Sequence, residues 1–325
     1  MIKILRSNNP INFVLMFVIM LGLWALKFIY MPQPIESYEY YSLIFPEFGE
    51  SLLSQYLSVI VAFIIYYGFA VFLIKTNLEL SIVESAYQTP GIFFVMLSGI
   101  YVNAQRILPE IIASMLLSMA IISIFFAYKK MKIYGTGFNV GLLYSLSVLV
   151  VPKFILFFPL LIFALFVVRP VSMREIVSLI IGFVCPIILA GSIVFLYFDF
   201  QEFIMNIGNA LTVSYNRISS YNFYVFSPIL ILAIIVLIAK LFLRVSQSVL
   251  SRKGQNVFSI FLLVSIIYFI SPFANNELIV ILFAPLSILL SYIFVNASKI
   301  VATFTFVGLF LGIIALQIAQ LYLIY

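Results

Sequence analysis

The chain has 325 residues, a formal net charge of +6 and a single cysteine. Hydrophobic residues make up 65 % of it and charged residues 9 %, whereas ordinary soluble domains have about 45–50 % and about 25 %. A soluble protein of this length has no way to bury so much apolar surface. The lack of histidine excludes histidine-ligated metals, Ser-His-Asp triads and histidine proton relays.

Apolar runs of about 20 residues recur from end to end, as membrane-spanning helices require. We therefore predict an all-α, polytopic helical bundle that forms a single transmembrane domain over residues 1–325. Its eleven expected segments are 11–31, 53–74, 88–104, 109–128, 136–151, 153–168, 174–197, 227–243, 257–271, 278–295 and 300–323. Either short pair, 88–128 or 136–168, can instead form a re-entrant hairpin, which reduces the number of segments to nine.

The first segment is predicted to be a retained span. Lys3 and Arg6 form a short basic start, and the apolar run that follows is too long for the core of a cleaved signal peptide. Asn8 or Asn9 is suited to cap this helix, with Pro10 in its first turn, where a missing N–H costs nothing.

The first predicted external loop, 32–52, carries four glutamates and no lysine or arginine. This composition is typical of a loop outside the membrane. A second interpretation is catalytic. Glu36 and Glu39 are three residues apart, so a helical turn places both carboxylates on one face. There they can act as a base or hold a metal against a leaving phosphate.

Two later segments start with an acidic residue. The sequence RILPEII places Pro109 and Glu110 in a first helical turn, where proline is tolerated and a carboxylate favours the positive end of the helix dipole. The sequence FANNELIV repeats this pattern, with Asn275 or Asn276 as the cap and Glu277 after it. Both patterns indicate helix starts.

The sequence RPVSMREI, residues 169–176, has two interpretations. Ser172 and Glu175 have the spacing of a capping box, and Pro170 ends the preceding helix. Alternatively, Arg169 and Arg174 bind lipid phosphates on the cytoplasmic face. The structural interpretation is favoured.

The second predicted external loop, 198–226, contains Arg217 as its only base, in the company of several tyrosines. A planar guanidinium in this setting suits a phosphate or a glycan. Arg106 is the other candidate phosphate-binding residue. An ordinary loop at the membrane interface explains the same composition.

Lysine and arginine are expected in excess on the cytoplasmic side. With the N-terminus inside and the C-terminus outside, 13 of the 17 bases lie inside and 8 of the 11 acids lie outside. The four bases placed outside are Lys27, Arg106, Lys153 and Arg217.

Three stretches resemble a family of uncharacterised polytopic inner-membrane proteins of Bacteroidota, a domain of unknown function. They are SNNPINF, FNVGLLYSLSVLVVP and FALFVVRPVSMREIVSLIIGFVCPIIL. Asn139 stands where the family commonly has an aspartate. The resemblance implies the bacterial inner membrane and supplies no activity. The architecture is more loosely similar to that of multi-span glycosyltransferases that use polyprenyl-phosphate-linked sugars.

Two functions follow as hypotheses. The first is a non-catalytic component of cell-envelope assembly or lipid handling, with membrane lipids and envelope proteins as partners. The alternative is a lipid-linked glycosyltransferase acting on the external face, with Glu36 and Glu39 as catalytic residues and a polyprenyl-phosphate-linked glycan as substrate. We assign no cofactor, no metal site and no nucleic-acid partner.

Overall fold

The computed structural model describes residues 5–6, 8–29, 52–128, 134–197, 205, 208, 220–243, 248–271 and 276–324. This part of the chain is helical and contains no strand. Its elements are α2 (Ile11–Ile29), α3 (Leu52–Leu80), α4 (Thr89–Ser98), η1 (Val102–Ala104), α5 (Pro109–Phe125), α6 (Tyr134–Val150), η2 (Pro152–Phe157), α7 (Phe158–Val168), α8 (Met173–Tyr197), α10 (Ser220–Phe242), α11 (Val249–Ile270), η3 (Asn276–Leu282), α12 (Phe283–Asn296) and α13 (Lys299–Ile324).

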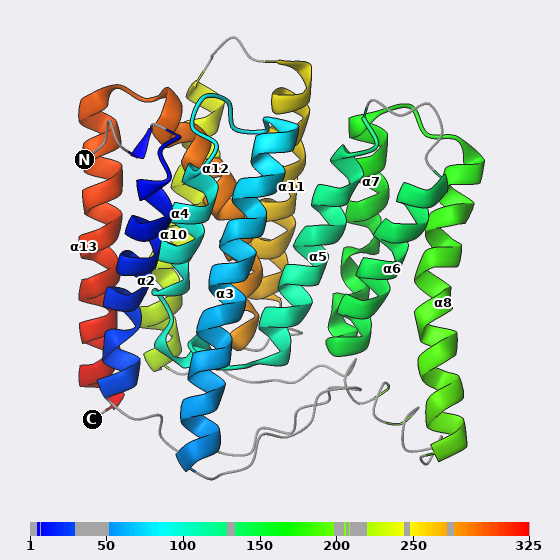
Figure 1. Ribbon diagram of the computed structural model, residues 1–325, viewed down its shortest axis with the longest axis horizontal. Coiled ribbons are helices and arrows are strands. Elements are labelled where there is room, and N and C mark those ends of the chain that lie inside the picture. The colour runs from blue at the N-terminus through cyan, green and yellow to red at the C-terminus, as the bar shows by residue number, and fades with distance from the viewer. Residues whose placement is uncertain are drawn as a thin grey trace.

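The helices run roughly parallel to one another and define two ends of the molecule (Figure 1). We call the end where α3, α5 and α7 finish the upper end, and the end where α2, α8 and α13 finish the lower end. Six of the described helical stretches are long and apolar enough to cross a membrane. Because the described residues are helical and contain no strand, the predicted all-α class is confirmed, whereas the number of membrane crossings stays a prediction.

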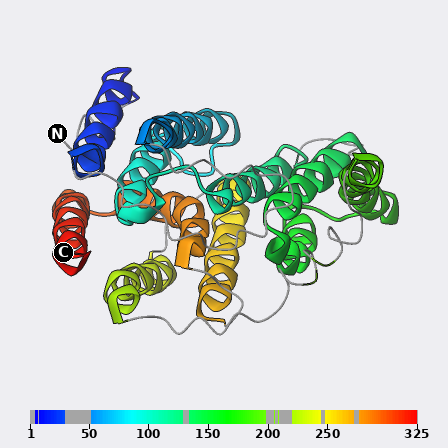
Figure 2. The same ribbon diagram turned by 90° about the horizontal axis from the view of Figure 1, so that it is seen from below.

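Helices α4 and α12 form the centre of the bundle. Every residue of α4 is buried, and α12 is buried from Phe283 to Phe294. The two pack against each other, and the view along the bundle shows them surrounded by α2, α3, α10, α11 and α13 (Figure 2). A short helix such as α4 therefore lies where other protein segments, rather than lipid, cover its ends.

Short 3₁₀ helices lengthen two of the shorter segments. η2 and α7 together extend roughly 28 Å, since a 3₁₀ helix rises about 2.0 Å per residue and an α-helix about 1.5 Å. This length approaches the roughly 30 Å of a bilayer's hydrocarbon core. The Tyr144 hydroxyl lies 2.9 and 2.8 Å from the carbonyl oxygens of Phe154 and Ile155, and so binds the backbone of η2 to α6.

Helices α6 and α8 approach each other closely at two glycines. A Cβ atom on Gly141 would lie 2.1 Å from the Leu179 carbonyl oxygen, and one on Gly182 would lie 2.2 Å from that of Phe138. Small residues permit this kind of backbone contact between membrane helices.

Local sequence predictions are confirmed at three helix starts. Asn9 Oδ1 accepts the Ile11 N–H at 3.1 Å. α5 begins at Pro109 with Glu110 in its first turn. Glu175 Oε2 accepts the Ser172 N–H at 3.0 Å, and Glu175 also pairs with Arg169 at 3.0 Å. This contact supports the structural interpretation of Arg169.

Several predicted boundaries are wrong. α10 begins at Ser220, inside the predicted external loop 198–226, and α11 begins at Val249 rather than at 257. A hydropathy window stops where polar residues start, whereas a helix satisfies its own backbone and continues beyond that point. Ser248 Oγ, which accepts the Ser251 N–H, caps the extended start of α11.

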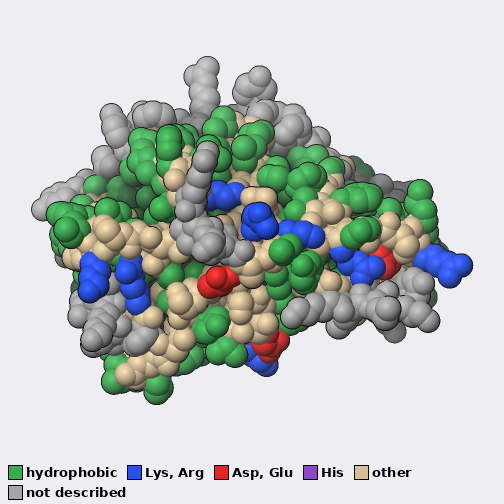
Figure 3. All heavy atoms as spheres, turned by 90° about the horizontal axis from the view of Figure 1, so that it is seen from above, with side chains coloured by type: hydrophobic (Ala, Val, Ile, Leu, Met, Phe, Trp, Pro, Cys, Tyr) green, Lys and Arg blue, Asp and Glu red, His purple; other side chains and the backbone are tan. Residues whose placement is uncertain are grey.

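Lysine and arginine side chains lie in a band across the upper face (Figure 3). The described bases at this end, judged from their positions near helix ends, are Arg6, Lys75, Arg169, Arg174, Lys240, Arg252, Lys253 and Lys299. Grouping of these bases at one end is what the charge topology predicts. Which side of the membrane this end faces stays a prediction.

Candidate functional site: a charge cluster and an apolar groove

Three segments that begin at the lower end each carry a charge near their first residue. Glu110 lies in the first turn of α5, Lys153 follows Pro152 in η2, and Glu277 lies in η3. α5 packs against η3 and α7, and η1 also contacts η3. The fold therefore brings together charges that are far apart in the sequence.

These charges interact electrostatically. Glu110 interacts with Glu277, Arg106 and Lys153, and Arg106 also acts on Lys27 at the end of α2. We call these five residues the lower charge cluster. It contains three of the four bases that charge topology places outside, with two carboxylates, and so has one positive charge in excess.

Buried polar atoms in and beside this cluster have no hydrogen-bond partner. Glu110 is only 5 % exposed and its Oε2 is unbonded, as is the Nε of Arg106. The hydroxyl of Tyr268, a residue 6 % exposed that interacts electrostatically with Glu110, is also unbonded. Because most buried polar groups in native proteins are hydrogen-bonded to protein or water, these atoms can bind a water molecule or a polar ligand.

The backbone that leads from α4 to Arg106, which includes the short 3₁₀ helix η1, is held by two glutamines of α13. Gln317 Nε2 donates to the carbonyl oxygens of Leu23 at 2.8 Å and Gly99 at 2.5 Å. Gln320 Nε2 donates to the Ile100 carbonyl at 2.6 Å, and its Oε1 accepts the Val102 N–H at 3.0 Å. Irregular backbone inside a membrane protein needs such partners, because lipid supplies none.

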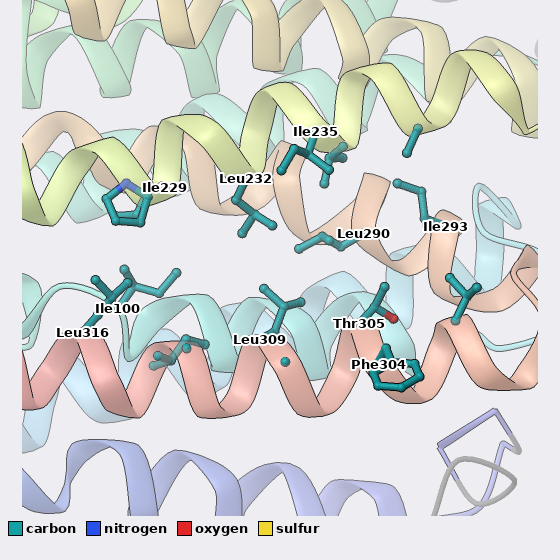
Figure 4. A pocket seen from close by; sticks show the side chains of 17 residues that line it. Ile100, Ile229, Leu232, Ile235, Leu290, Ile293, Phe304, Thr305, Leu309 and Leu316 are labelled. Atoms are coloured by element: carbon teal, nitrogen blue, oxygen red, sulfur yellow. The ribbon is translucent and has the colours of Figure 1, made fainter.

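An apolar groove of about 450 Å³ lies between α10 and α13, with α12 behind it (Figure 4). Leu232 and Ile235 of α10 face Leu309 of α13 across it. Gly308 and Gly312 also line it, and a Cβ at either would meet nothing within 4 Å. Ile100 lies at one end of the groove, on the same segment of chain as Arg106.

The predicted site residues have different outcomes. Arg106 belongs to the lower charge cluster, whereas Glu36, Glu39 and Arg217 lie outside the described residues. Sequence analysis did not assign Lys27, Glu110, Lys153 or Glu277 to a common site. The available signal was that three bases break the cytoplasmic charge bias. Within the described ranges, no three acidic or cysteine side chains lie close enough together to hold a metal ion.

The fold and composition place the chain in the class of α-helical membrane proteins. Comparison with known proteins found no match: no family model, no curated protein and no solved structure matches the chain.

Proposed function

We propose that the protein is a non-catalytic, lipid-handling component of the bacterial inner membrane, with eleven membrane-crossing segments and its lower end outside. The observation that supports this function best is the groove between α10 and α13. It lies between two helices whose neighbouring side chains are exposed and apolar, among them Ile231, Phe304 and Leu311. Its occupant in a bilayer is an acyl chain.

The shape and lining of the groove fit a chain of this kind. Its α13 wall runs from Val301 to Leu316, roughly 22 Å of helix at about 1.5 Å per residue. Its lining is apolar apart from Thr305 and the backbone. Close contacts with many methyl and methylene groups favour a hydrocarbon chain there over a loosely packed bilayer.

The other features of this function rest on the sequence. The inner-membrane location is proposed from the resemblance of three sequence stretches to proteins of Bacteroidota. Envelope proteins are proposed as partners because the function is a component of cell-envelope assembly or lipid handling. The alternative, a polyprenyl-phosphate-sugar glycosyltransferase, depends on Glu36 and Glu39, which lie outside the described residues, and it stays a prediction.

Filling the groove tests the lipid-handling function. The Gly308→Leu/Gly312→Leu double variant places two large side chains in space that is open in the wild type. Native mass spectrometry, after purification from phosphatidylcholine vesicles, counts the phospholipids that each protein retains. We expect the wild type to retain bound phospholipid and the double variant to lose it.

Gly191→Leu on α8 is the matched control. A Cβ at Gly191 also meets nothing within 4 Å, but this residue lies outside the groove. The control should retain lipid like the wild type. Equal retention by the wild type and the double variant would contradict the proposed function.

A further inference from the structure

The lower charge cluster has the chemistry of an anion site. Arg106 and Tyr268 each present a buried donor atom without a partner, Arg106 Nε and Tyr268 Oη. α5 begins at Pro109, beside these residues in the cluster, and its N-cap residue Leu108 supplies no side-chain cap. Unpaired donors and a helix N-terminus both favour a negative group.

Charge balance favours the same ligand. The cluster's three bases exceed its two carboxylates by one positive charge. Lys27, Arg106 and Lys153 would repel a divalent cation, whereas an anion compensates the excess positive charge. An arginine guanidinium with nearby lysines is the combination that proteins use for phosphate oxygens.

We propose that the lower charge cluster binds a phosphate group, with Arg106 as the principal donor, assisted by Lys153, Lys27 and Tyr268. Glu110 and Glu277 oppose the binding of phosphate, because their negative charges repel it. The bound group is either inorganic phosphate or the phosphate of a lipid headgroup. This site is independent of the acyl-chain groove, because phosphate needs no hydrocarbon tail to bind.

Arg106 and Glu110 carry opposite charges, so removing each charge should change phosphate affinity in opposite directions. Arg106→Gln removes a positive charge and its donors, so we expect the dissociation constant for phosphate to rise at least about tenfold, as the loss of a charge-assisted hydrogen bond implies. Glu110→Gln keeps the size of the side chain and removes a repelling charge, so we expect phosphate to bind several-fold more tightly. A merely structural role for both residues would weaken binding in both variants or in neither.

Calorimetric titration of inorganic phosphate into full-length protein in phosphatidylcholine nanodiscs measures these constants. Arg174→Gln, which alters an exposed arginine at the upper end, should bind phosphate like the wild type. A second arm repeats the titration in nanodiscs that contain phosphatidic acid. Loss of the phosphate signal there identifies the lipid headgroup as the ligand, and an unchanged signal identifies free phosphate.

Absence of phosphate binding in the wild type in both kinds of nanodisc would overturn the proposal, and so would equal affinities of the wild type, Arg106→Gln and Glu110→Gln. Loss of lipid from the groove variant affects neither of these phosphate measurements. The lipid-handling proposal and the phosphate-site proposal can therefore be refuted independently.

Discussion

The two ends of the bundle use their charged residues differently. At the upper end Arg6 Nη2 donates to the carbonyl oxygens of Phe294 and Ala297, although its Nε has no partner. Lys253 donates to the Val168 carbonyl at 2.7 Å. At the lower end Glu110, Arg106 and Tyr268 keep buried polar atoms unbonded. The first arrangement holds helix ends in place, and the second leaves bonding capacity for another molecule.

The upper contacts follow from helix geometry. Arg6 meets the last carbonyls of α12, and Lys253 meets the last carbonyl of α7. The final carbonyls of a helix lack partners within it and carry its negative partial charge, so cations stabilise them. Arg6 and Lys253 therefore stabilise the upper ends of α12 and α7. The 3₁₀ helices η3 and η2, which lead into α12 and α7 at the lower end, carry Glu277 and Lys153.

The largest expected effect, an all-or-none result, concerns which side each end faces. Reporter fusions after Lys132 and Arg252 should be cytoplasmic, and fusions at Glu50 and Tyr325 external, because most bases are expected inside. Activity of alkaline phosphatase and fluorescence of a green fluorescent protein fusion measure the two sides. A cytoplasmic reporter at Glu50 would reverse the assignment of the lower end.

Arg6→Met should be the most destabilising single change among the charged residues of the upper end. It removes charge-assisted hydrogen bonds to two carbonyls, each worth about 1.5–3 kcal/mol, so we expect the free energy of unfolding to fall by about 3 kcal/mol. Unfolding by SDS in mixed micelles measures this change. Arg174→Met, at an exposed position, is the control and should change stability little. Equal stabilities of the two variants would remove the capping role of Arg6.

Glu175→Ala should have the next largest effect. It deletes both the contact with Arg169 and the hydrogen bond from the Ser172 N–H, so we expect a loss of about 2 kcal/mol in the same assay. Glu175→Gln keeps an acceptor for Ser172 and loses only the charge, so its expected loss is about 1 kcal/mol. If the two variants lost the same free energy, the backbone contact of Glu175 would contribute nothing.

The sequence predicted the local features of the upper end better than the lower charge cluster. Ser172 and Glu175 are three residues apart, so their contact follows from the geometry of one helix turn. Lys27, Arg106, Lys153 and Glu277 belong to four separate segments, and only the packing of those segments brings them together. The groove was not predicted either, because an apolar helix face looks the same whether it meets lipid, protein or a cavity.

Glu110→Gln is expected to have the smallest effect on stability, and it tests the contrast between the ends directly. Glu110 and Glu175 are both buried glutamates in the first turn of a helix. Glu175 has partners, whereas Oε2 of Glu110 has none. Glutamine has nearly the same shape and keeps an oxygen that can accept the hydrogen bond of the Glu110 backbone N–H, so the change removes the charge and leaves that contact in place. We expect the free energy of unfolding to change by less than about 0.5 kcal/mol, below the loss expected for Glu175→Gln.

If Glu110 instead anchored Arg106 and Lys153 through structural ion pairs, its removal would cost about 3–5 kcal/mol, because uncompensated charges would stay buried. SDS unfolding separates these outcomes clearly. A loss of about 3–5 kcal/mol would show that the lower charges stabilise the fold as the upper ones do. It would also remove the reason to expect a ligand at the lower end.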